Sequence, residues 1–536
     1  MPSQHWDGRH LNQIHENPIY RNMRNYKKGS SIINCFIAGG LVITILLFTG
    51  CSASRTVVSP SKKYSLSKIQ KDYSIFRNML ETYHPGLYWY TTKDTLDYLF
   101  QQKYRQLKDS MTESEFRKVL SFIISGIHCG HTALRPSKGF AGEYDSARTK
   151  VFPLTLKVWD DTAVIIANLN RKDSVLKRGT VISKINGRPI QSLIDTFFRF
   201  ISADGYNKTH KWQTLSNRGY FGSIYTSLFG LSDKYNIEYI DSAGHTRSVQ
   251  LPVYNPAADT AGRSASFRPA PFMPGLTKRE RKKLQLSNTR SLRFDSANHI
   301  AFMTLNTFSR GSQIKKFIRT SFKKLRKNNS GYFVIDVRGN GGGNVTNSTK
   351  LSRYLATQRF RVADSLYAIK KQGLYGRYIQ NNFFNRLFIT FTSKKKNDGH
   401  YHFGYFERHY FKPKKKNHFD GNTYIITGGN SFSATTLFIS EVKDQDNVTI
   451  VGEETGGGAY GNTAWLIPEV TLPETKVRFR LPLFRLVIDK NNPKNGRGIF
   501  PTVEVKPTTA SILQGRDIKI EKVMELIRED KSKKEK

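Results

Sequence analysis

The chain has 536 residues, of which 38% are hydrophobic and 12% aromatic, so it can bury more than one sizeable core and is neither a peptide nor a disordered segment. Its length predicts two or three domains. Lysine and arginine number 85 against 42 acidic residues, and the formal net charge of +43 would suit an anionic partner such as nucleic acid. The three cysteines exclude a disulfide-stapled scaffold.

Residues 1–51 predict a secretory signal. Basic residues between Arg21 and Lys28 precede an apolar run from Ile32 to Thr49, and Gly-Cys follows. The tetrapeptide Phe-Thr-Gly-Cys that ends at Cys51 resembles a bacterial lipobox. This resemblance implies that Cys51 is lipidated and becomes the mature N-terminus. The alternative is an uncleaved transmembrane helix, because roughly 18 to 20 residues can span a bilayer.

In either case most of the chain leaves the cytoplasm, which argues against nucleic acid as the partner. The positive charge is then expected to face anionic lipid head groups or cell-wall polymers. The residue after the cysteine is Ser52, and in bacterial lipoproteins a non-acidic residue at that position favours the outer membrane. The predicted location is therefore the bacterial cell envelope, through a lipid anchor at the periplasmic face of the outer membrane.

After the signal, residues 52–63 are expected to form a polar tether and residues 64–137 a small helical domain. Apolar residues recur at helical spacing in the stretches 69–83, 96–107 and 116–127. Thr112 precedes the last stretch and Glu115 follows three positions later, which is the spacing of a capping box.

Residues 150–255 predict a β-rich domain, because the apolar period changes to two from Val151 onward. The passage from Lys177 to Pro189 carries the pattern I-x-x-I-N-G and resembles the segment of a PDZ domain that precedes its helix. PDZ domains capture peptides by adding a strand to a sheet edge. The alternative is any other small β-rich domain. Residues 256–289, rich in Pro, Ala, Ser and Arg, are expected to be a linker.

Residues 290–510 alternate apolar strands with helical stretches, which predicts an α/β core. Within this core, residues 394–415 are polar, aromatic and basic, and are expected to form a solvated excursion; contact with an anionic surface is the alternative. Residues 511–536 are expected to form a C-terminal helix and a basic tail. The predicted fold class is multi-domain α/β: a helical N-terminal domain, a PDZ-like domain and an α/β core.

The chemistry is expected in three short segments. The first runs from Tyr424 to Phe438 and combines a strand, a glycine-rich turn and the start of a helix. Unpaired N–H groups at a helix start favour developing negative charge, so a serine there is a candidate nucleophile. Ser431 and Ser433 are both candidates. A serine in this place could instead cap the helix.

The second segment runs from Phe333 to Asn344, a buried strand that leads into glycines. Its uncovered N–H groups could bind an oxyanion or a phosphate. No Gly-Lys-Ser/Thr follows, which excludes a P-loop, and Asn344 occupies the position of the last glycine of a dinucleotide fingerprint.

The third segment runs from Ile127 to Thr132. His128, Cys129 and His131 could be metal ligands, but no second Cys/His pair completes the set, so no metal is predicted. A histidine that acts as a general base for a distant serine needs only spatial contact.

Together these segments resemble the S41 family of serine peptidases, the relatives of C-terminal-processing and tricorn peptidases. The resemblance rests on the D-x-R-G-N-x-G-G motif that begins at Asp336, on the serine segment, and on V-G-E-x-T-x-G at Val451 to Gly457. It implies a ClpP/crotonase-like core. In the family motif S-A-S-E the first serine matches Ser433, and threonines replace the second serine and the glutamate.

The resemblance also implies roles for other residues. The backbone N–H groups of Ala434 and Gly342 would form the oxyanion hole. The lysine base of the C-terminal-processing branch is missing, since Gly458 occupies its position. The tricorn-like branch uses a histidine instead, which matches His131, while His128 could pack against it or support it. An imidazole suits proton transfer near neutral pH. Asn495 could replace the acid that orients the histidine.

The predicted function is that of a lipid-anchored envelope serine endopeptidase that acts on protein or peptide substrates without metal or cofactor. One alternative is a non-catalytic envelope lipoprotein of the same fold that binds peptides or other ligands. A basic module that holds anionic cell-wall or lipid polymers is another. Nothing in the sequence indicates the oligomeric state.

Overall fold

A computed structural model describes residues 59–140, 149–259, 276–371 and 373–535. One compact unit spans Val57–Lys536. The predicted signal, the lipidation site at Cys51 and the first residues of the predicted tether lie outside the described residues.

Three helices begin the described chain: α2 (Leu66–Tyr83), α3 (Lys93–Tyr104) and α4 (Glu113–Ile127). Thr112 caps α4 in the predicted capping box with Glu115. A short antiparallel pair, β1 (Lys63–Tyr64) and β2 (Met111–Thr112), connects the first and last of these helices.

These helices share a core with strands from the far end of the chain. The ring of Phe76 packs edge-on against Phe479, with 5.1 Å between ring centroids. Strand β3 (Leu134–Arg135) pairs with β20 (Arg478–Arg480), which pairs with β19 (Glu469–Thr471). The buried carboxylate of Asp72 accepts hydrogen bonds from the backbone and side chain of Thr475. The helical segment is therefore joined to the C-terminal half of the chain.

The next segment is an antiparallel sheet with a core of its own. The strands, in the order β4-β5-β6-β8-β9 with β7 beside β6, are β4 (Leu154–Trp159), β5 (Thr162–Asn168), β6 (Val181–Ile185), β7 (Arg188–Pro189), β8 (Lys234–Ile240) and β9 (Thr246–Pro252). Its helices are α6 (Ile190–Phe198), α7 (Lys208–Ser216) and α8 (Tyr220–Phe229).

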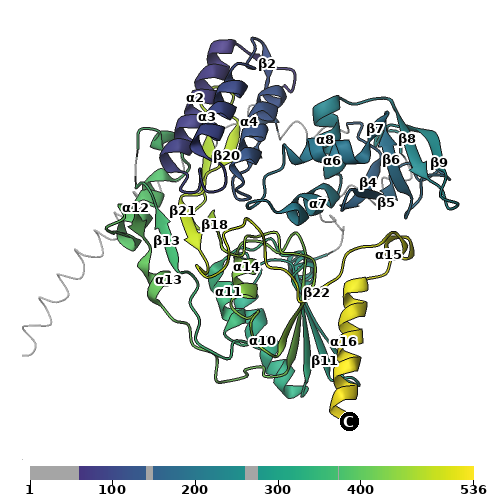
Figure 1. Cartoon of the computed structure of the whole chain (residues 1–536), viewed down its shortest axis with the longest axis vertical. Helices are drawn as coiled ribbons and strands as arrows, with labels where there is room; N and C mark the ends of the chain where they lie inside the picture. Colours follow the sequence, from purple (N-terminus) through teal and green to yellow (C-terminus); the bar gives the residue numbers. More distant parts are fainter. Residues whose placement is uncertain (1–58, 141–148, 260–275, 372, 536) are drawn as a thin grey trace, which may run out of the picture. The chain divides into compact units, whose positions relative to one another are not determined.

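The central element is a six-stranded sheet in the order β10-β11-β12-β16-β17-β22, in which all neighbours are parallel except the β10–β11 pair (Figure 1). Its strands are β10 (Arg290–Asp295), β11 (Ile300–Leu305), β12 (Tyr332–Asp336), β16 (Asn422–Thr427), β17 (Val448–Gly452) and β22 (Val503–Glu504).

Helices cover both faces of this sheet, as expected for parallel strands made of continuous apolar runs. One face packs against α10 (Ile314–Lys327), α11 (Val345–Ser352) and α14 (Ala434–Ser440). The other face packs against α16 (Ile518–Glu535), which follows α15 (Thr509–Gln514). The predicted multi-domain α/β fold is confirmed.

A second sheet has the order β14-β15-β13-β21-β18. Its strands are β13 (Ser365–Ala368), β14 (Lys394–Lys395), β15 (Tyr401–His402), β18 (Gly461–Ala464) and β21 (Phe484–Val487), and beside them lie η2 (Gly376–Tyr378), α12 (Asn382–Thr392) and α13 (Gly404–Arg408). The basic segment 394–415 thus contributes two strands to a sheet. In the predicted linker 256–289, α9 (Lys278–Thr289) is a helix without a buried residue.

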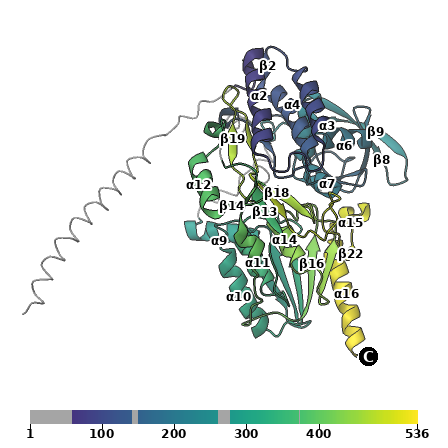
Figure 2. The ribbon, with the colours of Figure 1, turned by 60° about the vertical axis from the view of Figure 1, so that its left-hand side comes forward.

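The arrangement of these layers is visible from two sides (Figures 1 and 2). The loops that follow β12 and β16 leave the same edge of the central sheet, because the carboxyl ends of parallel strands meet there. Among the described helices, none has the length and apolarity needed to cross a membrane.

Candidate active site

Ser433 lies at the sharp turn between β16 and α14. Its backbone has φ 57° and ψ −121°, a conformation that costs a non-glycine residue on the order of 1–3 kcal/mol. Ser433 occupies the position before the helix, yet its side chain makes no capping hydrogen bond. The hydroxyl instead lines a cavity of about 850 Å³. A strained turn that presents an unengaged serine is typical of nucleophile elbows.

Ser431, the competing candidate, is fully buried and already engaged. Its Oγ donates to the carbonyl of Val337 at 2.9 Å and accepts from the N–H of Gly428 at 3.2 Å. These two bonds join the serine turn to the end of β12. Ser431 is therefore a structural residue of the turn.

The glycine turn after β12 contacts Ser433 directly. Gly342 has φ +91°, and a Cβ built on it would lie 2.7 Å from the Cβ of Ser433 and 2.9 Å from the N of Ala434. Only glycine allows this approach. Gly342 was expected to donate its N–H to the oxyanion. In the structure this N–H already donates to Oδ1 of Asn340 at 2.9 Å.

Three other N–H groups of the serine turn and the glycine turn have no acceptor among the described residues. They belong to Ala434, and to Gly341 and Gly343, both of which are exposed and line the cavity. Backbone N–H groups in such a position can stabilise an oxyanion. Ala434 thus keeps its predicted donor position.

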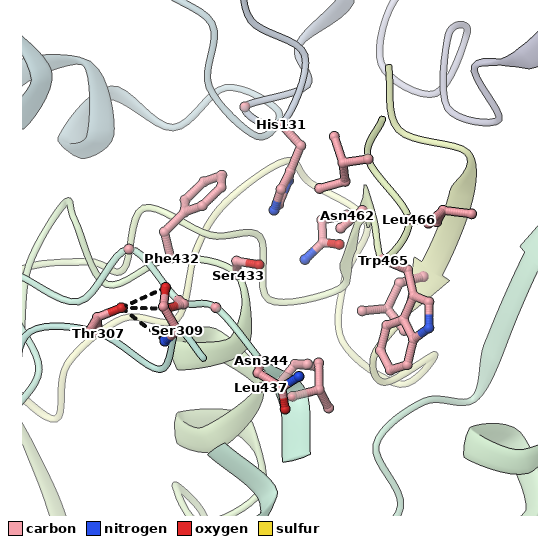
Figure 3. A pocket seen from close by; sticks show the side chains of 18 of the residues that line it. His131, Thr307, Ser309, Asn344, Phe432, Ser433, Leu437, Asn462, Trp465 and Leu466 are labelled. Carbon is pink, nitrogen blue, oxygen red and sulfur yellow. Dashed lines mark hydrogen bonds between the residues drawn. The ribbon is translucent and has the colours of Figure 1, made fainter. Parts of the chain in front are cut away.

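His131 lies in the loop between α4 and β3 and lines the same cavity as Ser433. Figure 3 shows its ring and the Ser433 side chain projecting toward one another from different elements. The side chain is 4% exposed, and neither ring nitrogen has a hydrogen-bond partner among the described residues. Its ring packs against Phe432, with 4.7 Å between centroids.

Asp204 is the acidic residue beside His131. Its Oδ1 lies 3.8 Å from Nδ1 of His131. The same carboxylate accepts from the N–H of Gly130 at 2.9 Å and from the N–H of Gly458 at 3.4 Å. Asp204 comes from the loop between α6 and α7, and no motif in the sequence marks it, so the sequence did not predict it.

His128 supports this arrangement. Helix α4 ends at Ile127, and the next residue, His128, adopts a left-handed conformation with φ 57°. Its Nδ1 lies 2.9 Å from the carbonyl oxygen of Gly205, and its own carbonyl accepts from the N–H of Gly205. Burial lowers the pKa of His128. This double contact holds the loop of Asp204 against the loop of His131.

Asn495, the predicted orienting residue, is not brought to His131. It is exposed, its Oδ1 accepts from the backbone N–H of Arg497 at 3.0 Å, and it lines a different cavity. The nearby buried acid is Glu454, which binds the Arg497 guanidinium and accepts from the amide of Asn207. Glu454 therefore ties the core to the segment of α7.

A second histidine flanks the site. His210 stacks on Phe432 with 4.9 Å between centroids, on the same aromatic ring that His131 contacts. Its Nδ1 lies 2.8 Å from the carbonyl oxygen of Gly429, which fixes the proton on that nitrogen. Burial lowers the pKa of His210.

The remaining wall of the cavity is largely apolar. It is formed by the side chains of Phe388, Phe403, Phe406, Leu437, Trp465, Leu466, Ile467 and Leu486. Arg480 and the amide of Asn462 add polar groups to this wall, and Oδ1 of Asn462 is buried without a partner among the described residues (Figure 3). A cavity with a broad apolar wall and a few polar groups suits an extended apolar chain segment.

Cys129, His131 and Asp204 are the described residues here that could hold a metal ion, since their ligand atoms lie within 4.8 Å of one another. Burial raises the pKa of the Cys129 thiol to about 12, and a metal would have to displace its proton. The oxygens of Asp204 already accept two backbone N–H groups. The geometry therefore suits a histidine–carboxylate pair better than a metal centre.

Residues 299–505 match the model of Peptidase family S41. This segment of the chain belongs to peptidase family S41. The match covers the central sheet from β11 to β22, with both the glycine turn and the serine turn. No curated protein sequence matches the chain significantly.

Two solved structures share the fold of most of this chain. Mature CPAF is 16% identical, with a TM-score of 0.58 over 87% of this chain and 98% of that one. Mature CPAF complexed with lactacystin is 14% identical, with the same TM-score over 84% of this chain and 95% of that one. The tricorn protease is 14% identical, with a TM-score of 0.37 over 87% of this chain and 37% of that one.

Proposed function

We propose that this S41 peptidase is a serine endopeptidase in which Ser433 is the nucleophile and His131 the general base. One observation carries the proposal: an unengaged serine on a strained turn lines the same cavity as a buried histidine whose ring nitrogens have no hydrogen-bond partner among the described residues. Of the two serine candidates, Ser433 alone has a hydroxyl free to react.

In the proposed reaction, His131 takes the proton from the Ser433 hydroxyl while the Oγ attacks the scissile carbonyl carbon. The tetrahedral intermediate collapses, the C–N bond breaks, and His131 gives its proton to the leaving amine. A water molecule then attacks the acyl-enzyme by the same route and releases the new carboxyl terminus. Since Nδ1 faces Asp204, Nε2 is the nitrogen assigned to Ser433.

Asp204 orients the imidazole and stabilises its protonated form. The separation of 3.8 Å is longer than a hydrogen bond. Catalytic hydrogen bonds are often long without substrate and shorten in the complex. The developing oxyanion would accept from the N–H of Ala434 and from the glycine turn, and removing one such donor typically costs about 3 kcal/mol of transition-state stabilisation.

The missing lysine of the resemblance supports this assignment. Gly458 occupies the lysine position, and its N–H donates to the carboxylate of Asp204. The residue at the position of the lysine base is thus hydrogen-bonded to the carboxylate that lies beside His131. A histidine base agrees with that substitution.

We further propose that the peptidase is held at the cell envelope by a lipid on Cys51, at the periplasmic face of the outer membrane. The apolar run and lipobox-like tetrapeptide support this placement. Protein or peptide chains are the proposed substrates, and the PDZ-like segment 150–255 is proposed to help bind them by strand addition.

The test uses residues 57–536, because this compact unit contains all the described hydrophobic cores. Casein and peptide cleavage are measured for the parent and for Ser433→Ala and His131→Ala. The matched control is Ser440→Ala on the same helix, which does not line the cavity. Loss of cleavage in the first two variants alone is expected. Full activity of Ser433→Ala would overturn the assignment.

A further inference from the structure

Helix α12 exposes an apolar face to solvent. Phe383, Leu387 and Phe391 follow one another at intervals of four residues and are 70%, 41% and 79% exposed. The side chain of Phe384, on the adjacent row, is 63% exposed. Ile389 is the buried residue of this helix. Surface helices of soluble proteins normally turn their apolar stripe inward, so the outer face of α12 needs a covering partner.

A cationic cavity of about 430 Å³ lies beside this face. Its basic lining residues are Lys370, Lys371, Arg386 and Lys395. Arg386 and Thr390 belong to α12 itself, so the cavity and the apolar face share one helix.

The cations of this cavity are not neutralised by the protein. No described carboxylate lies within ion-pair distance of any of the four. The acidic residues of the same segment have other partners: Asp398 contacts His402, and Glu407 binds Lys396 and His402. Lys371 lies over the ring of Tyr401, at 4.8 Å from its centroid. The cavity therefore offers several donors to an external anion.

We propose that α12 and the cationic cavity dock the enzyme on a bilayer that contains anionic phospholipid. The phosphate of a headgroup enters the cavity, and the side chains of Phe383, Leu387 and Phe391 insert at the boundary between headgroups and acyl chains. Helices that lie in a membrane interface combine such an apolar face, rich in Phe and Leu, with flanking Lys and Arg. Each cation near an anionic leaflet adds to the attraction.

Charge complementarity favours a lipid surface over a second copy of the chain. A second copy seated on α12 would bring its own net charge of +43 toward the four unneutralised cations. An anionic bilayer supplies both the negative charge and the apolar layer that this surface lacks.

Docking through α12 would also orient the catalytic cavity. Phe388 of the same helix lines the cavity of Ser433, while Arg386 and Thr390 line the cationic one. The two cavities thus adjoin different sides of α12. Docking would hold the part of the catalytic cavity that Phe388 lines close to the membrane surface.

The test is vesicle flotation with residues 57–536, which lack Cys51 and hence any lipid of their own. Vesicles are made of phosphatidylcholine alone or of phosphatidylcholine with phosphatidylglycerol. Binding to the anionic vesicles and weak binding to the neutral ones are expected. The double variant Phe383→Ser/Phe391→Ser and the triple variant Lys370→Gln/Lys371→Gln/Lys395→Gln should both lose binding. The triple variant should lose about a hundredfold in affinity, since each cation contributes roughly fivefold.

The matched control removes equal charge from α10, an exposed cationic helix whose apolar residues are buried or partly buried in the core. Lys316→Gln/Lys323→Gln/Lys327→Gln should bind as the parent does. An equal loss of vesicle binding in both triple variants would show that net charge alone causes binding, and would overturn the proposal. Absence of binding by the parent would also overturn it. A parent dimer in sedimentation that Phe383→Ser/Phe391→Ser abolishes would assign the face to a second copy instead. Unchanged thermal unfolding shows that the variants are folded.

Discussion

The Nδ1 atom of His131 lies 3.8 Å from Oδ1 of Asp204, and both side chains are buried. The two residues come from loops that follow different helices, and the contact exists because the backbone of Gly205 pairs with His128. Asp204 is thereby fixed between the histidine loop and Gly458. This relationship supplies the orienting partner of His131, the role for which Asn495 was expected to replace the acid.

Asp204→Asn should therefore lower kcat by about a hundredfold or more while KM changes little, because an amide stabilises an imidazolium poorly. The measurement is steady-state cleavage of one peptide across pH. Asn495→Ala is the matched control, since its side chain is exposed and lies apart from the cavity. If Asn495→Ala lost activity and Asp204→Asn kept it, the acid assignment would be reversed.

Ser431→Ala should destabilise the fold more than it affects chemistry. The change leaves the N–H of Gly428 and the carbonyl of Val337 without their buried partner, at a typical cost of about 1–3 kcal/mol. Urea unfolding measures the loss, and active-site titration measures the fraction of competent enzyme. Unchanged stability together with complete inactivation would instead point to Ser431 as the reacting group.

The apolar wall of the catalytic cavity should set substrate preference. Peptides with a large apolar side chain beside the scissile carbonyl should be cleaved with higher kcat/KM than matched peptides with an acidic side chain there. The reason is that several aromatic rings line the cavity, while its described lining contains no acidic residue. Trp465→Ala should reduce this preference by about tenfold, the effect of losing 1–3 kcal/mol of apolar contact. Equal cleavage of both peptides by the parent would contradict this prediction.

Glu441 should make stability depend on pH. One carboxyl oxygen accepts from Ser352, the other has no partner among the described residues, and burial raises the pKa from 4.5 to about 8. The protonated Glu441 side chain stabilises the folded state fully below pH 4.5. This stabilisation is lost as the pH rises through 8, because the ionised carboxylate is unfavourable in a buried place. Between pH 5 and 9, the free energy of unfolding in urea should fall less for Glu441→Gln than for the parent. The difference should reach up to a few kcal/mol, at about 1.4 kcal/mol per pKa unit. Parallel pH profiles for the two proteins would exclude this role.

The elements of the central sheet could be predicted from the sequence because parallel strands are continuous apolar runs. The strands expected at the start of the segments Phe333 to Asn344 and Tyr424 to Phe438 illustrate this, because they coincide with β12 and β16 of the structure. The local signal at Thr112 also predicted the start of α4, since a capping box involves only residues three positions apart. These signals are short in range and need no knowledge of the tertiary fold.

The site was predictable only in part, for physical reasons. Ser433 and His131 lie on segments that carry motifs, whereas Asp204 is placed by a tertiary contact between loops. The engagement of Gly342 by the Asn340 side chain depends on a turn conformation that the glycine pattern does not specify. Likewise, the core shared by Phe76 and Phe479 joins chain segments that no local pattern relates.

The central claim is that Ser433 reacts and that His131 activates it. The most direct measurement is labelling of residues 57–536 with a fluorophosphonate, followed by peptide mass mapping of the modified residue. One modified residue, Ser433, is predicted, with labelling slowed by at least about a hundredfold in His131→Ala. Modification of another serine, or no labelling of a folded and soluble protein, would contradict the account.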